Sequence, residues 1–150
     1  MTTSQWLFSF RGRLIRFGYW MAMLALVPML FVAFLATLLA AFSSPSFGNG
    51  LAGLSLYLFV LLATHIPPLW IALAVGVKRL HDRNRSGWWL ILFYVAPGVL
   101  YVTGETIGGF GIGLALAGVA IFVWALVELG LLRGTTGVNR YGPDPFALTG

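Results

Sequence analysis

The residues of this sequence that could do chemistry gather in three short polar segments. The longest of them, at positions 78–86, reads Lys-Arg-Leu-His-Asp-Arg-Asn-Arg-Ser, and the others are an N-terminal segment and a C-terminal tail. Guanidinium groups bind phosphate in a bidentate geometry, so these segments together could hold an anionic, phosphate-bearing ligand. The candidate binding residues are Arg11, Arg13, Arg79, His81, Asp82, Arg83, Arg85, Asn139, Arg140 and Asp144.

The same charges have a purely structural interpretation. Asp82 and Asp144 would pair with Arg79, Arg83 or Arg140 and so hold the loop and the tail together. The remaining charges would then only set the orientation in a membrane. The sequence leaves both interpretations open.

We predict no catalytic residues, no metal and no cofactor. His81 and Asp82 could act as an acid–base pair on a lipid, but adjacent residues on one helix or strand point in different directions. A zinc site needs about four ligands, and the second histidine, His65, lies in a different environment. The chain has no cysteine, which removes thiolate ligands and a thiol nucleophile.

Composition identifies the solvent of the elements that carry these residues. The chain has 150 residues, of which 59% are apolar and 9% charged. Soluble domains are about 45–50% apolar and about 25% charged, so lipid must surround much of this chain. We predict an all-α integral membrane bundle, one domain over 1–150, with spans at about 17–42, 51–77, 87–104 and 106–132. The third stretch is marginal in length and could instead be a re-entrant hairpin.

The placement of charge favours four spans. The net charge is +5, and with four spans all nine Lys and Arg lie on one side, in the N-terminal segment, the loop 78–86 and the tail 133–150. If the third stretch failed to cross, Arg133 and Arg140 would move to the other side, giving seven against two. The positive-inside rule therefore predicts four spans with both termini cytoplasmic in a bacterial inner membrane. It also attributes the basic charge to topology and anionic lipid rather than to nucleic acid.

The three polar segments resemble a known family. They read Phe-Arg-Gly-Arg at 10–13 followed by Phe-Gly-Tyr-Trp at 17–20, Arg-Leu-His-Asp at 79–82 with Ser-Gly-Trp-Trp at 86–89, and Gly-Val-Asn-Arg-Tyr-Gly-Pro-Asp-Pro at 137–145. Together they are similar to small bacterial inner-membrane proteins grouped as domain of unknown function 805. The resemblance implies a four-span protein with cytoplasmic termini, and it supplies no activity.

Two ionisable residues are predicted inside the spans. His65 lies near the bilayer centre, and the two prolines after it leave the carbonyls at positions 63 and 64 without donors. A neutral His65 would donate to one of these carbonyls or to a neighbouring helix. Glu128 lies about one turn inside Arg133, close enough to reach the interface or a basic side chain.

Small residues also recur at four-residue spacing. Gly109, Gly113 and Ala117 form such a series in the fourth span, and Ala72 and Gly76 in the second. We expect these positions to pack helices of the same chain closely, the alternative being contact with another copy in a homo-oligomer.

The leading hypothesis is a non-enzymatic membrane protein whose cytoplasmic face binds anionic lipid headgroups or a protein partner. The alternatives are a small proton-coupled transporter or channel that uses His65 and Glu128, and an enzyme that acts on lipid.

Overall fold

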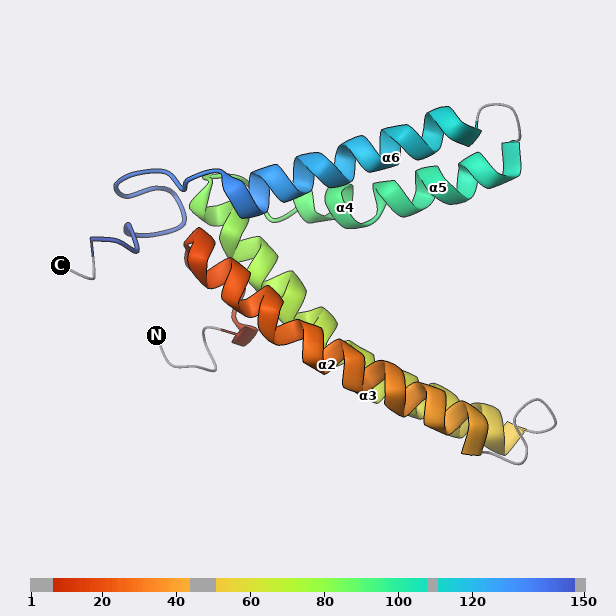
Figure 1. Ribbon diagram of the computed structural model, residues 1–150. Coiled ribbons are helices and arrows are strands. Elements are labelled where there is room, and N and C mark those ends of the chain that lie inside the picture. Colours follow the sequence, from red (N-terminus) through yellow and green to blue (C-terminus); the bar gives the residue numbers. More distant parts are fainter. Residues whose placement is uncertain (1–6, 44–50, 108–110, 148–150) are drawn as a thin grey trace. The chain divides into compact units, whose positions relative to one another are not determined.

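The computed structural model describes residues 7–43, 51–107 and 111–147 and is all-α within them. The predicted turn at 44–50 and the small residue Gly109 lie outside the described residues. The elements are α2 (Arg16–Ser43), α3 (Leu51–Asp82), α4 (Trp89–Tyr94), α5 (Ala96–Ile107), α6 (Gly111–Leu126) and the short π-helical turn η1 (Val127–Leu131) (Figure 1).

Four helical stretches are long and apolar enough to cross a membrane. They are Arg16–Phe42, Gly53–Asp82, Trp89–Ile107 and Gly111–Leu131. The third combines α4 and α5 and has 19 residues, which meets the length of about 17–25 residues that a span needs. The predicted all-α class with four membrane-spanning helices is confirmed.

The chain forms two compact units, which we describe separately. The first unit contains Met1–Trp20 and Leu73–Gly150, and the second contains Met21–Ala72. All nine Lys and Arg residues and all four Asp and Glu residues belong to the first unit.

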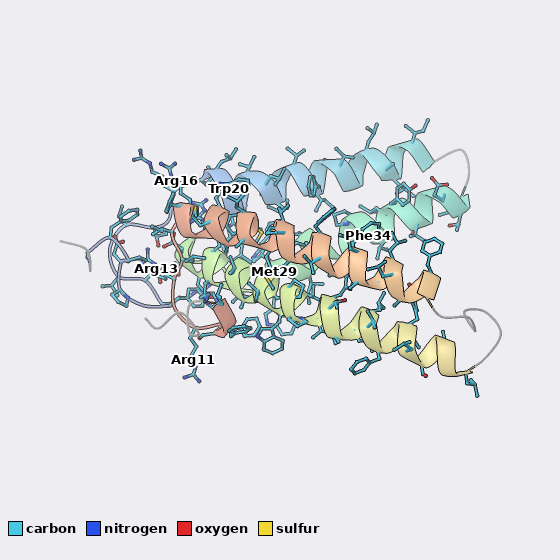
Figure 2. The ribbon with its side chains drawn as sticks, turned by 60° about the horizontal axis from the view of Figure 1, so that its bottom comes forward. Arg11, Arg13, Arg16, Trp20, Met29 and Phe34 are labelled. Atoms are coloured by element: carbon cyan, nitrogen blue, oxygen red, sulfur yellow. The ribbon has the colours of Figure 1, made fainter. Side chains whose placement is uncertain are left out.

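In the second unit, the remaining lengths of α2 and α3 lie side by side as an antiparallel pair (Figures 1 and 2). Ala22, Ala33 and Ala40 are buried, and small side chains let helices in lipid approach closely. His65 Nδ1 donates to the carbonyl of Leu61 at 2.9 Å, one turn earlier in α3. The prediction that His65 bonds to a carbonyl at position 63 or 64, or to a neighbouring helix, is therefore wrong. The acceptor one turn back lies within reach of an unstrained histidine side chain.

In the first unit, α5 and α6 pack as a close antiparallel pair (Figure 1). A Cβ built on Gly104 would lie 2.9 Å from the carbonyl oxygen of Gly111, so the two backbones meet where only glycine fits. Gly118 is also buried, whereas Gly113 and Ala117 are exposed. Within the first unit, Gly113 and Ala117 therefore do not pack helices together as expected. Gly113 lies two residues from Gly111, and two residues rotate a helix by about 200°, away from the packed face.

Gly76 behaves as expected, because it is buried against Leu90 of α4. A Cβ built on Gly76 would lie 3.0 Å from the nearest Leu90 side-chain carbon. A small residue in α3 thus allows the start of the third span to pack closely.

Helix α3 continues to Asp82, so residues 78–82 are helical although the sequence predicted a loop from 78. The helix ends in a Schellman motif. The N–H of Arg85 donates to the Leu80 carbonyl at 2.8 Å, and the N–H of Asn84 donates to the His81 carbonyl at 2.9 Å. Asn84 has φ 57°, the left-handed conformation that asparagine tolerates better than most residues. Glu105 lies within α5.

Candidate functional site

The polar side chains of the first unit gather where α3 and η1 end and α2 begins. We call this region, residues 9–16, 78–89 and 127–147, the arginine-rich end. It contains all nine Lys and Arg residues but only three of the four acidic residues, because Glu105 lies in α5. Nine positive and three negative charges leave an excess of six.

Asp82 lies at the centre of the arginine-rich end and bridges two arginines. Its carboxylate accepts hydrogen bonds from Arg13 Nε at 3.0 Å and from Arg79 Nη1 at 2.6 Å. These three side chains are at most 4% exposed. Such a buried cluster is tolerated because every charged group in it has a partner.

Arg79 also closes the end of the fourth span. Its Nε donates to the carbonyl of Leu129 at 2.7 Å, and its Nη2 donates to the carbonyl of Leu132. The last carbonyls of a helix have no partner within the helix and carry partial negative charge. The guanidinium group of Arg79 donates hydrogen bonds to these carbonyls and offsets their negative charge. Arg79 therefore joins the ends of the second and fourth spans.

Arg13 attaches the N-terminal segment to the tail. Its Nη1 donates to the carbonyl of Gly137 at 2.6 Å and its Nη2 to the carbonyl of Thr135. The backbone of Asp82 contributes as well, because its carbonyl accepts the N–H of Thr135 at 2.8 Å. Gly134 passes so close to Asp82 that a Cβ there would overlap the carboxylate. The tail is thus packed directly on the Asp82 cluster.

Glu128 forms a second cluster with two arginines. Its Oε1 lies 3.2 Å from Arg83 Nε and 2.7 Å from Arg85 Nε, and its own side chain is 3% exposed. The guanidinium group of Arg85 also lies 5.0 Å from the ring centroid of Trp89, a cation–π contact. Glu128 is the second residue of η1, and single π-helical turns occur frequently at functional sites.

The tail residues form a tight turn against the end of α3. Asn139 and Gly142 exchange two backbone hydrogen bonds of 3.1 Å, which places Arg140 and Tyr141 at the tip. The Tyr141 ring stacks on His81 with centroids 3.8 Å apart. Asn139 Nδ2 also donates to the carbonyl of His81 at 3.0 Å, so one predicted binding residue of the tail contacts one of α3.

Asp144, unlike Asp82, forms no ion pair with an arginine in the part of the chain that the structure describes. Its carboxylate accepts the backbone N–H of Phe146 at 3.0 Å and that of Gly137 at 2.8 Å. These two N–H groups, that of Phe146 first, lower the pKa of the Asp144 carboxyl from its usual value of 3.8. The two carboxylates that could link the loop and the tail therefore do so differently. Asp82 pairs with arginine side chains, and Asp144 accepts hydrogen bonds from backbone N–H groups.

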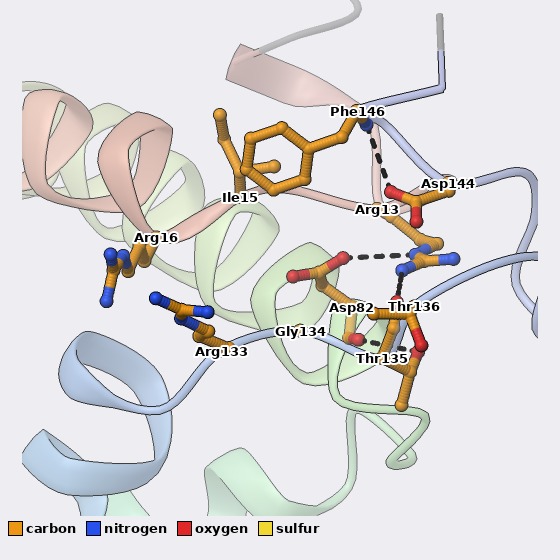
Figure 3. A pocket seen from close by; sticks show the side chains of 10 residues that line it. All are labelled: Arg13, Ile15, Arg16, Asp82, Arg133, Gly134, Thr135, Thr136, Asp144 and Phe146. Atoms are coloured by element: carbon orange, nitrogen blue, oxygen red, sulfur yellow. Dashed lines mark hydrogen bonds and ion pairs between the residues drawn. The ribbon is translucent and has the colours of Figure 1, made fainter.

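A cavity of about 340 Å³ opens beside the Asp82 cluster (Figure 3). Its lining comprises Arg13, Ile15, Arg16, Asp82, Arg133, Gly134, Thr135, Thr136, Asp144 and Phe146. Arg16 and Arg133 are both exposed, and neither side chain makes an ion pair within residues 7–43, 51–107 and 111–147.

Sequence reasoning used Arg16 and Arg133 only to assign topology and did not place them in the candidate site. Their positions in the sequence could have identified both arginines. Arg16 begins the first candidate span and Arg133 follows the last residue of the fourth by two positions, so both are expected at the same membrane boundary. Arg11, which was in the predicted set, points away from the helices, and its side chain has no ion pair among the described residues (Figure 2).

The other candidate residues for chemistry are placed as follows. In the part of the chain that the structure describes, no group of three His, Cys, Asp or Glu side chains could hold a metal ion. His65 belongs to the second unit and Glu128 to the first. His81 Nδ1 donates to the Gly12 carbonyl at 3.3 Å, and Asp82 is engaged by two arginines.

Comparison with known proteins identifies the family. A family model described as "Protein of unknown function (DUF805)" matches residues 7–143, which include the first two polar segments and the third as far as Pro143. The chain belongs to this family. The resemblance of the polar segments to DUF805 is thus confirmed.

Several proteins of Escherichia coli K12 are similar to the chain. "Uncharacterized protein YiiR" is 37% identical over 147 residues, which cover 96% of this chain and 90% of that protein. "Inner membrane protein YhaH" is 30% identical over 136 residues, covering 91% and 86%, and "Inner membrane protein YhaI" is 33% identical over 90 residues, covering 60% and 53%. No solved structure matches the chain. This DUF805 member is accordingly an inner-membrane protein with four candidate spans.

Proposed function

We propose that the arginine-rich end lies at the cytoplasmic surface of the inner membrane and binds anionic lipid headgroups, and that the protein catalyses no reaction. The observation that carries this proposal is the excess of guanidinium charge left after the internal ion pairs are formed. Asp82 and Glu128 are each shared by two arginines, so each cluster keeps one positive charge.

The depth of these charges supports a lipid ligand. Arg16 begins one candidate span, Arg83 directly follows another, and Arg133 lies just beyond a third. Side chains at the ends of spans reach the headgroup layer, where each Lys or Arg near an anionic surface contributes about 1 kcal/mol of attraction. The positive-inside rule supports the cytoplasmic orientation.

The contacts of the two residues best suited to acid–base chemistry support a non-catalytic role. Both carboxylate oxygens of Asp82 accept hydrogen bonds from buried guanidinium groups, which occupy lone pairs that a base would use. His81 is stacked on Tyr141 rather than directed at a carboxylate. These contacts favour binding over acid–base catalysis by His81 and Asp82.

Native mass spectrometry of the protein released from its own membrane tests the binding. We expect retained phospholipid enriched in anionic headgroups relative to the bulk membrane, and loss of that lipid as the salt concentration rises. Retained lipid with the bulk composition would contradict the proposal. A stoichiometric protein in place of lipid would replace it with a protein-binding function.

The absence of cysteine from the chain allows a clean test of orientation. Intact cells that carry a single cysteine, either Thr136→Cys or Ser46→Cys, are treated with a membrane-impermeant maleimide. We expect labelling at Ser46→Cys but not at Thr136→Cys. The opposite pattern would place the arginine-rich end outside the cytoplasm.

A further inference from the structure

We propose that the cavity lined by Arg16 and Arg133 is a specific site for one phosphate group and takes a phosphomonoester in preference to a phosphodiester. The inference rests on the proposed function and deepens it, because it assigns the ligand to one cavity instead of to the general charge of the arginine-rich end.

Two arginines near the cavity already bind other groups of the fold. Arg13, which lines the cavity, donates to Asp82, Thr135 and Gly137. Arg79, which shares Asp82 with Arg13, donates to Asp82 and to three backbone carbonyls. These two guanidinium groups have few donors left for a ligand.

Arg16 and Arg133 differ from Arg13 and Arg79. Figure 3 shows both guanidinium groups at the edge of the same cavity, and neither has an acidic partner among the described residues (Figure 3). Two like charges beside one cavity repel each other, and an anion bound there would offset that repulsion. The two groups come from segments more than 100 residues apart, so only the folded unit brings them together.

A contact between α2 and η1 keeps the backbones of these two arginines close together. Trp20, one turn after Arg16 in α2, donates from Nε1 to the carbonyl of Gly130 at 3.0 Å. Gly130 lies three residues before Arg133, and a Cβ there would lie 2.6 Å from the Trp20 ring. The missing side chain of Gly130 thus lets the first turn of α2 approach η1 directly. The separation of Arg16 and Arg133 follows from this packing and does not depend on a ligand.

The size of the cavity and its remaining lining fit a headgroup rather than a whole lipid. Its volume of about 340 Å³ lies at the lower end of the range of about 300–1,000 Å³ for small-molecule sites. Ile15 and Phe146 supply an apolar wall. The two carboxylates that line the cavity are occupied, Asp82 by two arginines and Asp144 by two backbone N–H groups, which reduces their repulsion of an anion.

The chemistry of two separate guanidinium groups favours a phosphomonoester. Each planar group can donate two parallel hydrogen bonds to a pair of oxygens. A phosphomonoester offers three unesterified oxygens and a charge of about −1.5 to −2 at pH 7, whereas a phosphodiester offers two such oxygens and one charge. The phosphate could belong to a lipid headgroup or to a soluble phosphoanion. The position of both arginines at span ends favours the lipid.

The experiment uses the full chain in a non-ionic detergent and measures lipid binding by native mass spectrometry. The probes are phosphatidic acid, phosphatidylglycerol with the same acyl chains, and inorganic phosphate. The variants are Arg16→Gln and Arg133→Gln, and the matched control is Arg11→Gln, which removes the same charge from the same end outside the cavity. Arg16→Lys and Arg133→Lys keep the charge, and they replace the Gln variants if those fail to fold.

We expect wild type to bind phosphatidic acid more tightly than phosphatidylglycerol. Arg16→Gln and Arg133→Gln should each weaken phosphatidic acid binding about tenfold or more, the usual effect of losing a hydrogen bond to a charged group. Arg11→Gln should stay within about twofold of wild type, and the Lys variants should fall between.

The outcomes separate this inference from the proposed function. Equal losses in all three Gln variants would overturn the specific site but leave general lipid binding intact. Failure of wild type to bind either lipid or phosphate would overturn both. Tighter binding of phosphatidylglycerol would overturn the monoester preference. Inorganic phosphate binding that matches phosphatidic acid and depends on the same two arginines would support the site and assign it to a soluble phosphoanion.

Discussion

Arg79 and Asp82 lie one turn apart at the end of α3 and form an ion pair of 2.6 Å between Nη1 and Oδ2. Arg13, far away in sequence, binds the other carboxylate oxygen at 3.0 Å. A buried ion pair need not add net stability, because desolvation of the charges opposes their attraction, but removing one partner leaves an uncompensated buried charge. Asp82 is the shared partner, so its replacement affects two buried cations at once.

We therefore predict that Asp82→Asn strongly destabilises the first unit. The free energy of unfolding should fall by about 3–5 kcal/mol, the range found when one partner of a buried ion pair is removed. Thermal unfolding of the purified protein in detergent measures the effect. Glu105→Gln is the control, since Glu105 is exposed in α5 and should unfold like wild type. A loss below about 1 kcal/mol in Asp82→Asn would contradict a central role for the cluster.

Glu128→Gln should destabilise the protein less than Asp82→Asn does. Glu128 is as buried as Asp82, but its partners Arg83 and Arg85 have side chains that are 23% and 36% exposed. These arginines can turn toward water when their carboxylate is lost, which Arg13 and Arg79 cannot do. The same unfolding measurement ranks the two variants. An equal or larger effect of Glu128→Gln would show that solvent does not compensate Arg83 and Arg85.

The four spans and the gathering of the polar segments were predictable from the sequence, for simple reasons. Long uncharged stretches have one stable environment, and four crossings bring the N-terminal segment, the end of α3 and the tail to one end. The pairing within this region was not predictable. Asp82 had several candidate partners, and its contact with Arg13, 69 residues away, depends on how the N-terminal segment packs.

The errors in detail arose where one backbone conformation decides the structure. Helix α3 continues past the predicted loop start at residue 78, because the left-handed residue that ends it is Asn84. The face of α6 that packs on α5 contains Gly111 and Gly118 at seven-residue spacing, whereas Gly113 and Ala117 of the more conspicuous four-residue series are exposed. The sequence contains both sets of small residues, and only the position of α5 shows which set packs against another helix.

Gly134→Ala should destabilise the arginine-rich end although it adds only a methyl group. A Cβ at Gly134 would lie 2.5 Å from Cγ of Asp82, so the tail would have to move off the cluster. Gly113→Ala is the matched control, because nothing lies within 4 Å of a Cβ built there. We expect a lower melting temperature for Gly134→Ala, and for Gly113→Ala an unchanged or slightly higher one. Equal melting temperatures would contradict the close packing of the tail on Asp82.

The order of the tail should depend on pH through Asp144. The N–H groups of Phe146 and Gly137 favour the charged carboxylate and hold its pKa below 3.8 in the folded tail. A group with a lowered folded-state pKa contributes its stability above the unfolded-state value and loses it as the pH falls through the folded-state pKa. The amide NMR signals of Gly137 and Phe146 should therefore shift as the pH falls, with a midpoint below pH 3.8. Asp144→Asn should remove that step, because the amide does not titrate. A midpoint at or above 3.8 in wild type would show that these two hydrogen bonds do not hold the tail in solution.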